Sequence, residues 1–156
     1  MLEVRIPGRK TFELENLVMD VNGTVAVDGE IIKDVIEKIR ELTECLNVYA
    51  VTAGTHGKLD KLESALEIEI HKIEPPKEAE QKQKFVEDLG VDKTACIGNG
   101  SNDTLMLRNS AIGIAVIGSE GAAAEAVSSA DVVVNDIRDA LDLLLKPKRL
   151  VATLRR

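Results

Sequence analysis

The segment Leu17-Val18-Met19-Asp20-Val21-Asn22-Gly23-Thr24 decides the fold that we predict for this chain. Its apolar start ends abruptly at an aspartate, as a buried strand of a parallel sheet does. The turn that follows would expose the Asp20 carboxylate at the sheet edge, where backbone N–H groups of the turn can hold an anion. The motif alone is weak, because Asp-x-Asn-Gly also occurs in ordinary turns and in calcium loops.

Further apolar runs end in the same way. Residues 48–51 lead into Thr52, and residues 95–97 lead into Gly98. Shorter runs with strand character are 68–73, 112–116 and 132–134. Helical spacing of apolar residues separates these runs, at 31–46, 58–66, 79–89, 105–108, 122–128 and 137–145.

Alternating strands and helices predict a parallel sheet with helices on both faces. Right-handed crossovers then give the α/β class, a three-layer α/β/α Rossmann-like sandwich with a mainly parallel central sheet. Ligands bind such sheets outside the carboxyl ends of the strands. Asp20, Thr52 and the loop at Gly98 all follow such ends, so we expect them to form one site.

The composition fits one globular domain over residues 1–156, with a basic tail at 147–156. Hydrophobic residues make up 44% and charged residues 30%, which excludes a disordered chain. A net charge of -7 repels a phosphate backbone, so we expect no nucleic-acid partner. No signal-peptide layout and no apolar run of membrane-span length is present, and we expect the tail to be solvated or frayed.

The two cysteines carry no motif that pairs them. Cys45 falls in a helical pattern and Cys96 in a strand pattern. We interpret both as buried, reduced thiols, which predicts a cytoplasmic protein.

Polar residues at the strand ends suit phosphate chemistry. The Thr52 hydroxyl and the adjacent backbone N–H of Ala53 can clamp a phosphate oxygen. Lys82, near the start of a predicted helix, can reach the phosphate as a point charge. Lys77 and Lys84 compete with it for this role.

The loop Gly98-Asn99-Gly100-Ser101-Asn102-Asp103 is the most specific segment. Its glycines permit a sharp turn from strand to helix. Asn99 and Asp103 offer oxygen ligands that suit Mg²⁺, and Asn102 can bridge Lys82 and the phosphate. An amide-rich helix cap is the alternative interpretation, and the motifs earlier in the chain disfavour it.

Taken together, these polar positions resemble the four sequence motifs of the haloacid dehalogenase (HAD) superfamily. They are Asp20, Thr52, Lys82 and the pair Asn99/Asp103. The resemblance covers residues 17–145, and the joint match is far more specific than any single piece. The segments most similar to the phosphorylation domain of P-type cation ATPases are 82–86, 98–103 and 112–116. The chain therefore resembles small soluble proteins described as P-type-ATPase-like.

The resemblance implies a Mg²⁺-dependent phosphohydrolase that acts on a small phosphomonoester. Asp20 would be the nucleophile that forms an aspartyl-phosphate, aided by Thr52 and Lys82. The residues implied in catalysis are Asp20, Asn22, Thr52 and Lys82. Those implied in substrate or phosphate binding are Asp20, Val21, Asn22, Thr52, Ala53, Lys82 and Asn102. Those implied in Mg²⁺ binding are Asp20, Asn22 through its backbone carbonyl, Asn99 and Asp103.

Two positions depart from the family pattern. Most family phosphatases carry at position 22 a second aspartate that protonates the leaving group and then activates water, and Asn22 cannot transfer that proton. Losing general acid–base help typically costs about 10²- to 10⁴-fold in rate, so we expect slow turnover. Asn99 stands where a metal-binding aspartate is usual, so the site lacks one negative charge.

The spacing of the motifs leaves no room for a cap domain. One helix and one strand fill the interval from Thr24 to Thr52, and the next interval is similar. Residues 25–31, with Asp28-Gly29 as a hairpin turn, predict a small β-flap. Capless relatives oligomerise over the site or act on large substrates, so we expect a homo-oligomer with specificity from the flap, the turn at 55–57 and a neighbouring subunit. Ion pumping is excluded, because membrane helices and the nucleotide-binding insertion are absent.

Two other classes of function compete with the phosphohydrolase. Asn22 and Asn99 together support a non-catalytic phosphate- or metal-binding module with a regulatory role. A phosphoacceptor receiver domain also uses Asp, Thr and Lys on a parallel sheet. Receivers carry an acidic pair well before the acceptor, and they have no counterpart of the loop at 98–103, which disfavours this third interpretation.

Overall fold

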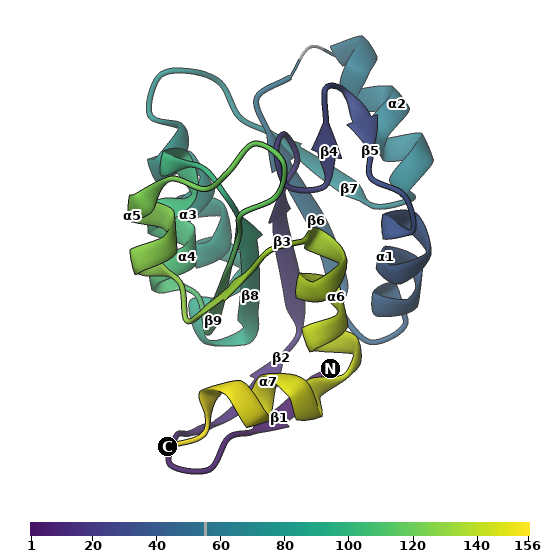
Figure 1. Cartoon of the computed structure of the whole chain (residues 1–156). Coiled ribbons are helices and arrows are strands. Elements are labelled where there is room, and N and C mark those ends of the chain that lie inside the picture. The colour runs from purple at the N-terminus through teal and green to yellow at the C-terminus, as the bar shows by residue number, and fades with distance from the viewer. Residues whose placement is uncertain (55) are drawn as a thin grey trace.

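A computed structural model describes residues 1–54 and 56–156, with only the backbone for 56 and 57 (Figure 1). Six strands form a central sheet in the order β10-β9-β8-β3-β6-β7. Their bounds are β3 Asn16–Asp20, β6 Asn47–Thr52, β7 Glu69–Lys72, β8 Thr94–Gly98, β9 Ile112–Val116 and β10 Val132–Val134. Every neighbouring pair in this sheet is parallel. The predicted α/β class with a parallel sheet is therefore confirmed.

Helices cover both faces of the sheet (Figure 1). One face carries α1 Val35–Thr43, α2 His56–Leu66 and α6 Ile137–Leu145, and the other carries α3 Glu78–Leu89, α4 Thr104–Asn109 and α5 Ala124–Ser129. Successive strand residues point to opposite faces, so Leu17 and Met19 of β3 pack in one core and Val18 packs in the other. This double burial explains why β3 reads as an unbroken apolar run.

The predicted β-flap is present beside the carboxyl ends of the strands (Figure 1). It consists of β4 Ala26–Val27 and β5 Glu30–Ile31, which pair antiparallel. Asp28 and Gly29 make its turn with positive φ angles of 53° and 82°. Because β5 takes Ile31, helix α1 begins only at Val35, later than the helical spacing predicts. The predicted turn at 55–57 lies outside the described side chains.

The C-terminal tail was predicted to be solvated or frayed; its basic residues are exposed, but the tail is not frayed. Residues Pro147–Leu154 form α7, which begins with a proline, a favoured first helical residue. Leu150 and Leu154 are buried, while the basic residues face outward. Helix α7 packs on an N-terminal hairpin, β1 Leu2–Arg5 with β2 Thr11–Leu14, which was also not predicted.

The structure shows how deeply the two cysteines are buried and whether any helix could span a membrane. Cys96 is fully buried, and burial raises its pKa to about 12, while Cys45 is only half-buried, less than predicted. Both cysteines are free. No helix in the described part of the chain has the length and apolar character that a bilayer span requires.

Candidate active site

The parallel register brings three motifs to one edge of the sheet. Asp20 ends β3, Thr52 ends β6, and Gly98 ends β8. Because β3 pairs with both β6 and β8, the loops after the three strands are neighbours. They surround a polar pocket of about 350 Å³. Its lining residues are Asp20, Asn22, Thr52, Ala53, Glu78, Lys82, Asn99, Gly100, Asn102 and Glu120.

Lys82 lies between two carboxylates at the base of this pocket. Its Nζ is 2.7 Å from Oδ1 of Asp20 and 2.6 Å from Oδ1 of Asp103. All three side chains are buried, and that of Lys82 is only 1% exposed. Burying an ammonium is costly unless it is paired, and here two partners hold it. The competing Lys77 and Lys84 are both exposed, so Lys82 is the lysine of the site.

Asp103 uses both of its oxygens within the protein. Oδ1 accepts from Lys82, and Oδ2 accepts from the backbone N–H groups of Asn99 and Gly100, each at 2.9 Å. A Cβ built on Gly98 would lie 2.5 Å from Cγ of Asp103, so only glycine lets the carboxylate approach this closely. Asp103 therefore positions the loop and the lysine, with little capacity left for a metal.

Thr24 links the nucleophile position to the loop after β8. Its Oγ1 lies 3.1 Å from Oδ2 of Asp20 and 3.2 Å from Oδ1 of Asn99. One hydroxyl has one hydrogen and cannot donate fully to both oxygens. Two oxygens thus converge with too few donors, and oxygen atoms of this kind suit Mg²⁺. The described residues hold no group of three or more His, Cys, Asp and Glu side chains fit for a metal, so amide and backbone oxygens would have to complete this set.

The phosphate-binding residues predicted beside Asp20 also meet at this edge. Nδ2 of Asn22 donates weakly to Oγ1 of Thr52 at 3.4 Å, and Ala53 lines the same pocket. Val21 is fully buried, and its carbonyl accepts from the N–H groups of three later residues of the turn. Val21 lines the adjoining pocket and is not among the residues that line this one.

Among the described residues no hydrogen bond joins Asn102 to Lys82, and the predicted bridge from Lys82 through Asn102 to a phosphate stays a prediction. Nδ2 of Asn102 donates to Oε2 of Glu78 at 2.7 Å. The two described partners of the Lys82 ammonium are Asp20 and Asp103. Asn102 still lines the pocket and stays available to a ligand.

The sequence did not single out Glu120, which also lines the pocket. A Cβ built on Gly23 would lie 2.3 Å from Oε2 of Glu120 and 2.6 Å from Nδ2 of Asn99. Asn99 holds the loop that carries Glu120, because its Nδ2 donates to the Gly121 carbonyl at 3.1 Å. An aspartate at position 99 would lack this donor. The loop that carries Glu120 follows the buried strand β9. This position after a strand was the sequence feature that could have indicated a site residue.

The buried charges shift one another's ionisation. Burial raises the pKa of Asp20 to about 6, and the Asp103 carboxylate adds to the rise, while Lys82 and Thr24 oppose it. Burial lowers the pKa of Lys82, but Asp20 and Asp103 outweigh it, so the net shift of that pKa is upward. Lys82 is therefore an ammonium near neutral pH. A cation placed beside Asp20 would favour its carboxylate form.

Comparison with known sequences gives one informative relative. No family model matches the chain. The chain is 51% identical over 78 residues to an uncharacterized protein of Methanocaldococcus jannaschii. The match spans 47% of this chain and 84% of that protein.

Solved structures share the fold over most of the chain. The 3-deoxy-D-manno-octulosonate 8-phosphate phosphatase of Moraxella catarrhalis, in complex with magnesium, phosphate and KDO, has a TM-score of 0.68 and 18% identity, covering 91% of this chain and 94% of that one. A Legionella pneumophila protein assigned to HAD subfamily III A has a TM-score of 0.68 and 19% identity, covering 90% and 87%. The catalytic domain of the CPx-ATPase CopB-B has a TM-score of 0.61 and 23% identity, covering 73% and 46%.

We expect Asp103→Asn to lower the free energy of unfolding by about 3 kcal/mol, because an amide cannot accept from Lys82 and from two N–H groups at once. Chemical denaturation of the purified protein measures the change. Asp88→Asn is the matched control, since Asp88 pairs with Lys84 on the exposed side of α3, and it should change stability by less than about 0.5 kcal/mol. Equal effects of the two variants would show that Asp103 has no positioning role.

Proposed function

We propose that this chain, which has the capless haloacid dehalogenase fold and belongs to one family with the Methanocaldococcus protein, is a Mg²⁺-dependent phosphohydrolase. Its substrate would be a small phosphomonoester, bound at the carboxyl edge of the sheet. The observation that carries the proposal is the contact of Lys82 with both Asp20 and Asp103 in a pocket that also holds Thr52. The phosphatase of similar fold binds magnesium and phosphate, which supports this chemistry.

Asp20 is the proposed nucleophile. One of its oxygens bonds to phosphorus while the bond to the ester oxygen breaks, which gives an aspartyl-phosphate and an alkoxide that takes its proton from water. Water then attacks the phosphorus and releases inorganic phosphate, and Asp20 is regenerated. The Lys82 ammonium has three hydrogens, of which two point to carboxylates, so the third is available to a phosphoryl oxygen. The Thr52 hydroxyl and the Ala53 N–H would hold the other phosphoryl oxygens.

The oxygens around Thr24 would hold the metal. The proposed ligands are Asp20 Oδ2, Asn99 Oδ1 and the backbone carbonyl of Asn22. Asp103 would lie just outside this set of ligands. When bound, Mg²⁺ supplies positive charge that stabilises the transferring phosphoryl group. The lysine and two carboxylates sum to one negative charge, and this charge favours a cation at the open side of Asp20.

Glu120 would restore the negative charge that the site loses at Asn99. Its carboxylate lies beside Gly23 and Asn99, on the side of the pocket where the proposed ligands converge. The amide of Asn99 fixes the loop that presents this carboxylate. The Glu120 carboxylate would thus supply the negative charge that the amide at position 99 lacks.

We expect Glu120→Gln to weaken Mg²⁺ binding about fivefold, since one nearby charge in a partly exposed site is worth about 1 kcal/mol. Isothermal titration of the substrate-free protein with Mg²⁺ measures this without any need for turnover. Glu125→Gln removes the same charge from an exposed position of α5 and is the control. If both variants bind Mg²⁺ like the wild type, Glu120 does not serve the metal.

Asn22 would make turnover slow, because it can neither protonate a leaving alkoxide nor activate water. We expect Asn22→Asp to raise kcat for an aryl phosphate by about 10²-fold. Asn22→Ala also loses the contact with Thr52 but adds no proton-transfer group, so it should bring no gain. An aspartate variant that is no faster than the wild type would contradict this role of position 22.

Release of phosphate from a panel of phosphomonoesters, with Mg²⁺ and with a chelator, tests the proposal as a whole. Hydrolysis should require the metal, and Asp20→Asn should abolish it while the circular dichroism spectrum stays native. Metal-independent hydrolysis, or activity that survives Asp20→Asn, would refute the mechanism.

The second candidate is a non-catalytic phosphate- or metal-binding module. The amides at positions 22 and 99 favour it, because each replaces a residue that the family uses in turnover. Tight binding of beryllofluoride with Mg²⁺, and no release of phosphate from any ester, would support it over the enzyme. Oligomerisation and a cytoplasmic location stay predictions from the sequence.

A further inference from the structure

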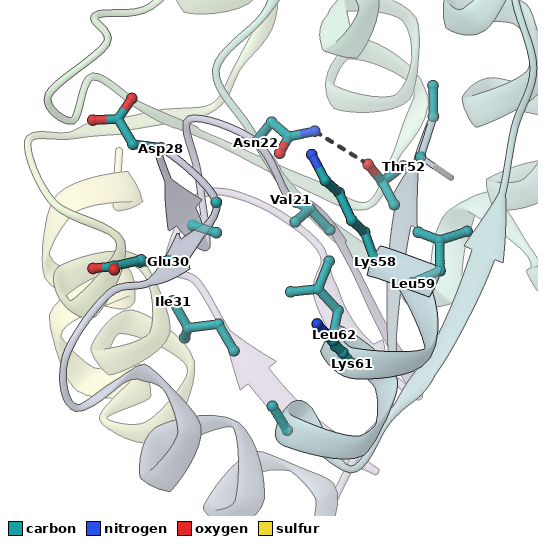
Figure 2. Close-up of a pocket in the computed structure, with 15 residues that line it drawn as sticks. Val21, Asn22, Asp28, Glu30, Ile31, Thr52, Lys58, Leu59, Lys61 and Leu62 are labelled. Carbon is teal, nitrogen blue, oxygen red and sulfur yellow. Dashed lines mark hydrogen bonds between the residues drawn. The ribbon is translucent and has the colours of Figure 1, made fainter. Parts of the chain in front are cut away.

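A second, larger pocket adjoins the polar one and has a different chemistry (Figure 2). Its volume is about 790 Å³, within the range of small-molecule sites. Asn22, Thr52 and Ala53 line both pockets, so the two are continuous at the point where an ester oxygen would leave the phosphoryl group. Whatever fills the larger pocket would therefore be the part of the substrate that departs.

The walls of this pocket are mainly apolar. The flap supplies Ala26 and Ile31 on one side, α2 supplies Leu59 and Leu62 on the other, and Val21 lies between them (Figure 2). A polyhydroxylated sugar would lose water from the hydroxyls that face these apolar walls. A compact hydrocarbon or aromatic group would gain from the same burial.

Lys58 and Lys61 both line this pocket, and Lys58 stands where it meets the polar one. The Lys58 side chain extends from α2 toward the hydrogen bond between Asn22 and Thr52 (Figure 2). Within residues 1–54 and 56–156 its ammonium has no ion pair. Asp28 and Glu30 also line this pocket, at its flap side, and their carboxylates point away from Lys58 (Figure 2).

From these observations we propose that the pocket between the flap and α2 selects a phosphomonoester whose leaving group is mainly apolar and carries a second anionic group, which pairs with Lys58. The inference rests on the proposed phosphohydrolase function and adds a substrate class to it. The proposed leaving group differs from the sugar acid bound by the phosphatase of similar fold, because the apolar walls favour a hydrocarbon or aromatic group.

Three esters of similar size test the proposal: phenyl phosphate, 3-carboxyphenyl phosphate and a hexose 6-phosphate. Isothermal titration with Mg²⁺ and the full-length Asp20→Asn variant measures binding without turnover, and wild-type assays give KM. We expect 3-carboxyphenyl phosphate to bind about fivefold more tightly than phenyl phosphate, as one partly exposed ion pair provides. The hexose phosphate should bind more weakly than either.

Lys58→Met should bring the ratio between the two aryl esters close to one. Lys84→Met removes a charge from an exposed position outside both pockets, and it should leave the ratio and the turnover unchanged. Equal binding of the two aryl esters, an equal loss for both on Lys58→Met, preference for the hexose phosphate, or no binding of any ester would overturn the proposal.

The design separates this inference from the proposed function. If the Asp20→Asn variant binds the esters selectively but the wild type hydrolyses none of them, the proposed selectivity of the pocket stands and the phosphohydrolase function is refuted. If all three esters are hydrolysed in a metal-dependent way with no preference for the carboxylated one, the phosphohydrolase function stands and the proposed selectivity of the pocket is refuted.

Discussion

A buried ammonium held by two buried carboxylates is the interaction on which the rest of the site depends. Lys82 comes from a helix, Asp20 from the central strand and Asp103 from the loop after β8, so their contact fixes three elements at once. Because Asp103 also accepts from two backbone N–H groups, the loop at 98–103 has one conformation that satisfies it. The requirement for Gly98 follows from the same close approach.

The charge of this cluster sets the chemistry that it can support. Two carboxylates and one ammonium leave a negative charge at the open side of Asp20, and oxygens of Asp20 and Asn99 share the single hydroxyl of Thr24. A divalent cation would neutralise this negative charge and coordinate the two oxygens that share the hydroxyl. The bound cation would then attract a phosphoryl group. The pocket next to the site shares Asn22, Thr52 and Ala53 with it, but the flap and α2 supply most of its remaining lining, so they would recognise the leaving group.

The sequence predicts the centre of the sheet because β3, β8 and β9 are buried along their whole length. The predicted limits of β9 and β10 match the structure, and the strand before Asp20 was placed within one residue. The hairpin at the N-terminus and helix α7 escaped prediction for the opposite reason. They bury only one face. In α7 the basic residues made the apolar pair Leu150 and Leu154 hard to recognise as a buried helix face.

The candidate site was predictable where a residue follows a strand, and not where a loop folds back. Asp20, Thr52 and Asn99 meet because the parallel register requires it. Glu120 and Glu78 reach the same pocket through loop and helix geometry, which spacing along the chain does not encode. Asn102 also lines the pocket, and its hydrogen bond to Glu78 depends on the same loop and helix geometry.

A crystal structure of the protein with Mg²⁺ and beryllofluoride is the most direct measurement of the central claim. The account predicts beryllium bonded to an Asp20 oxygen, fluorine atoms in contact with Lys82 and Thr52, and the cation about 2.1 Å from oxygens of Asp20 and Asn99. Beryllofluoride bound away from Asp20, or a cation outside the oxygens that Thr24 joins, would contradict it.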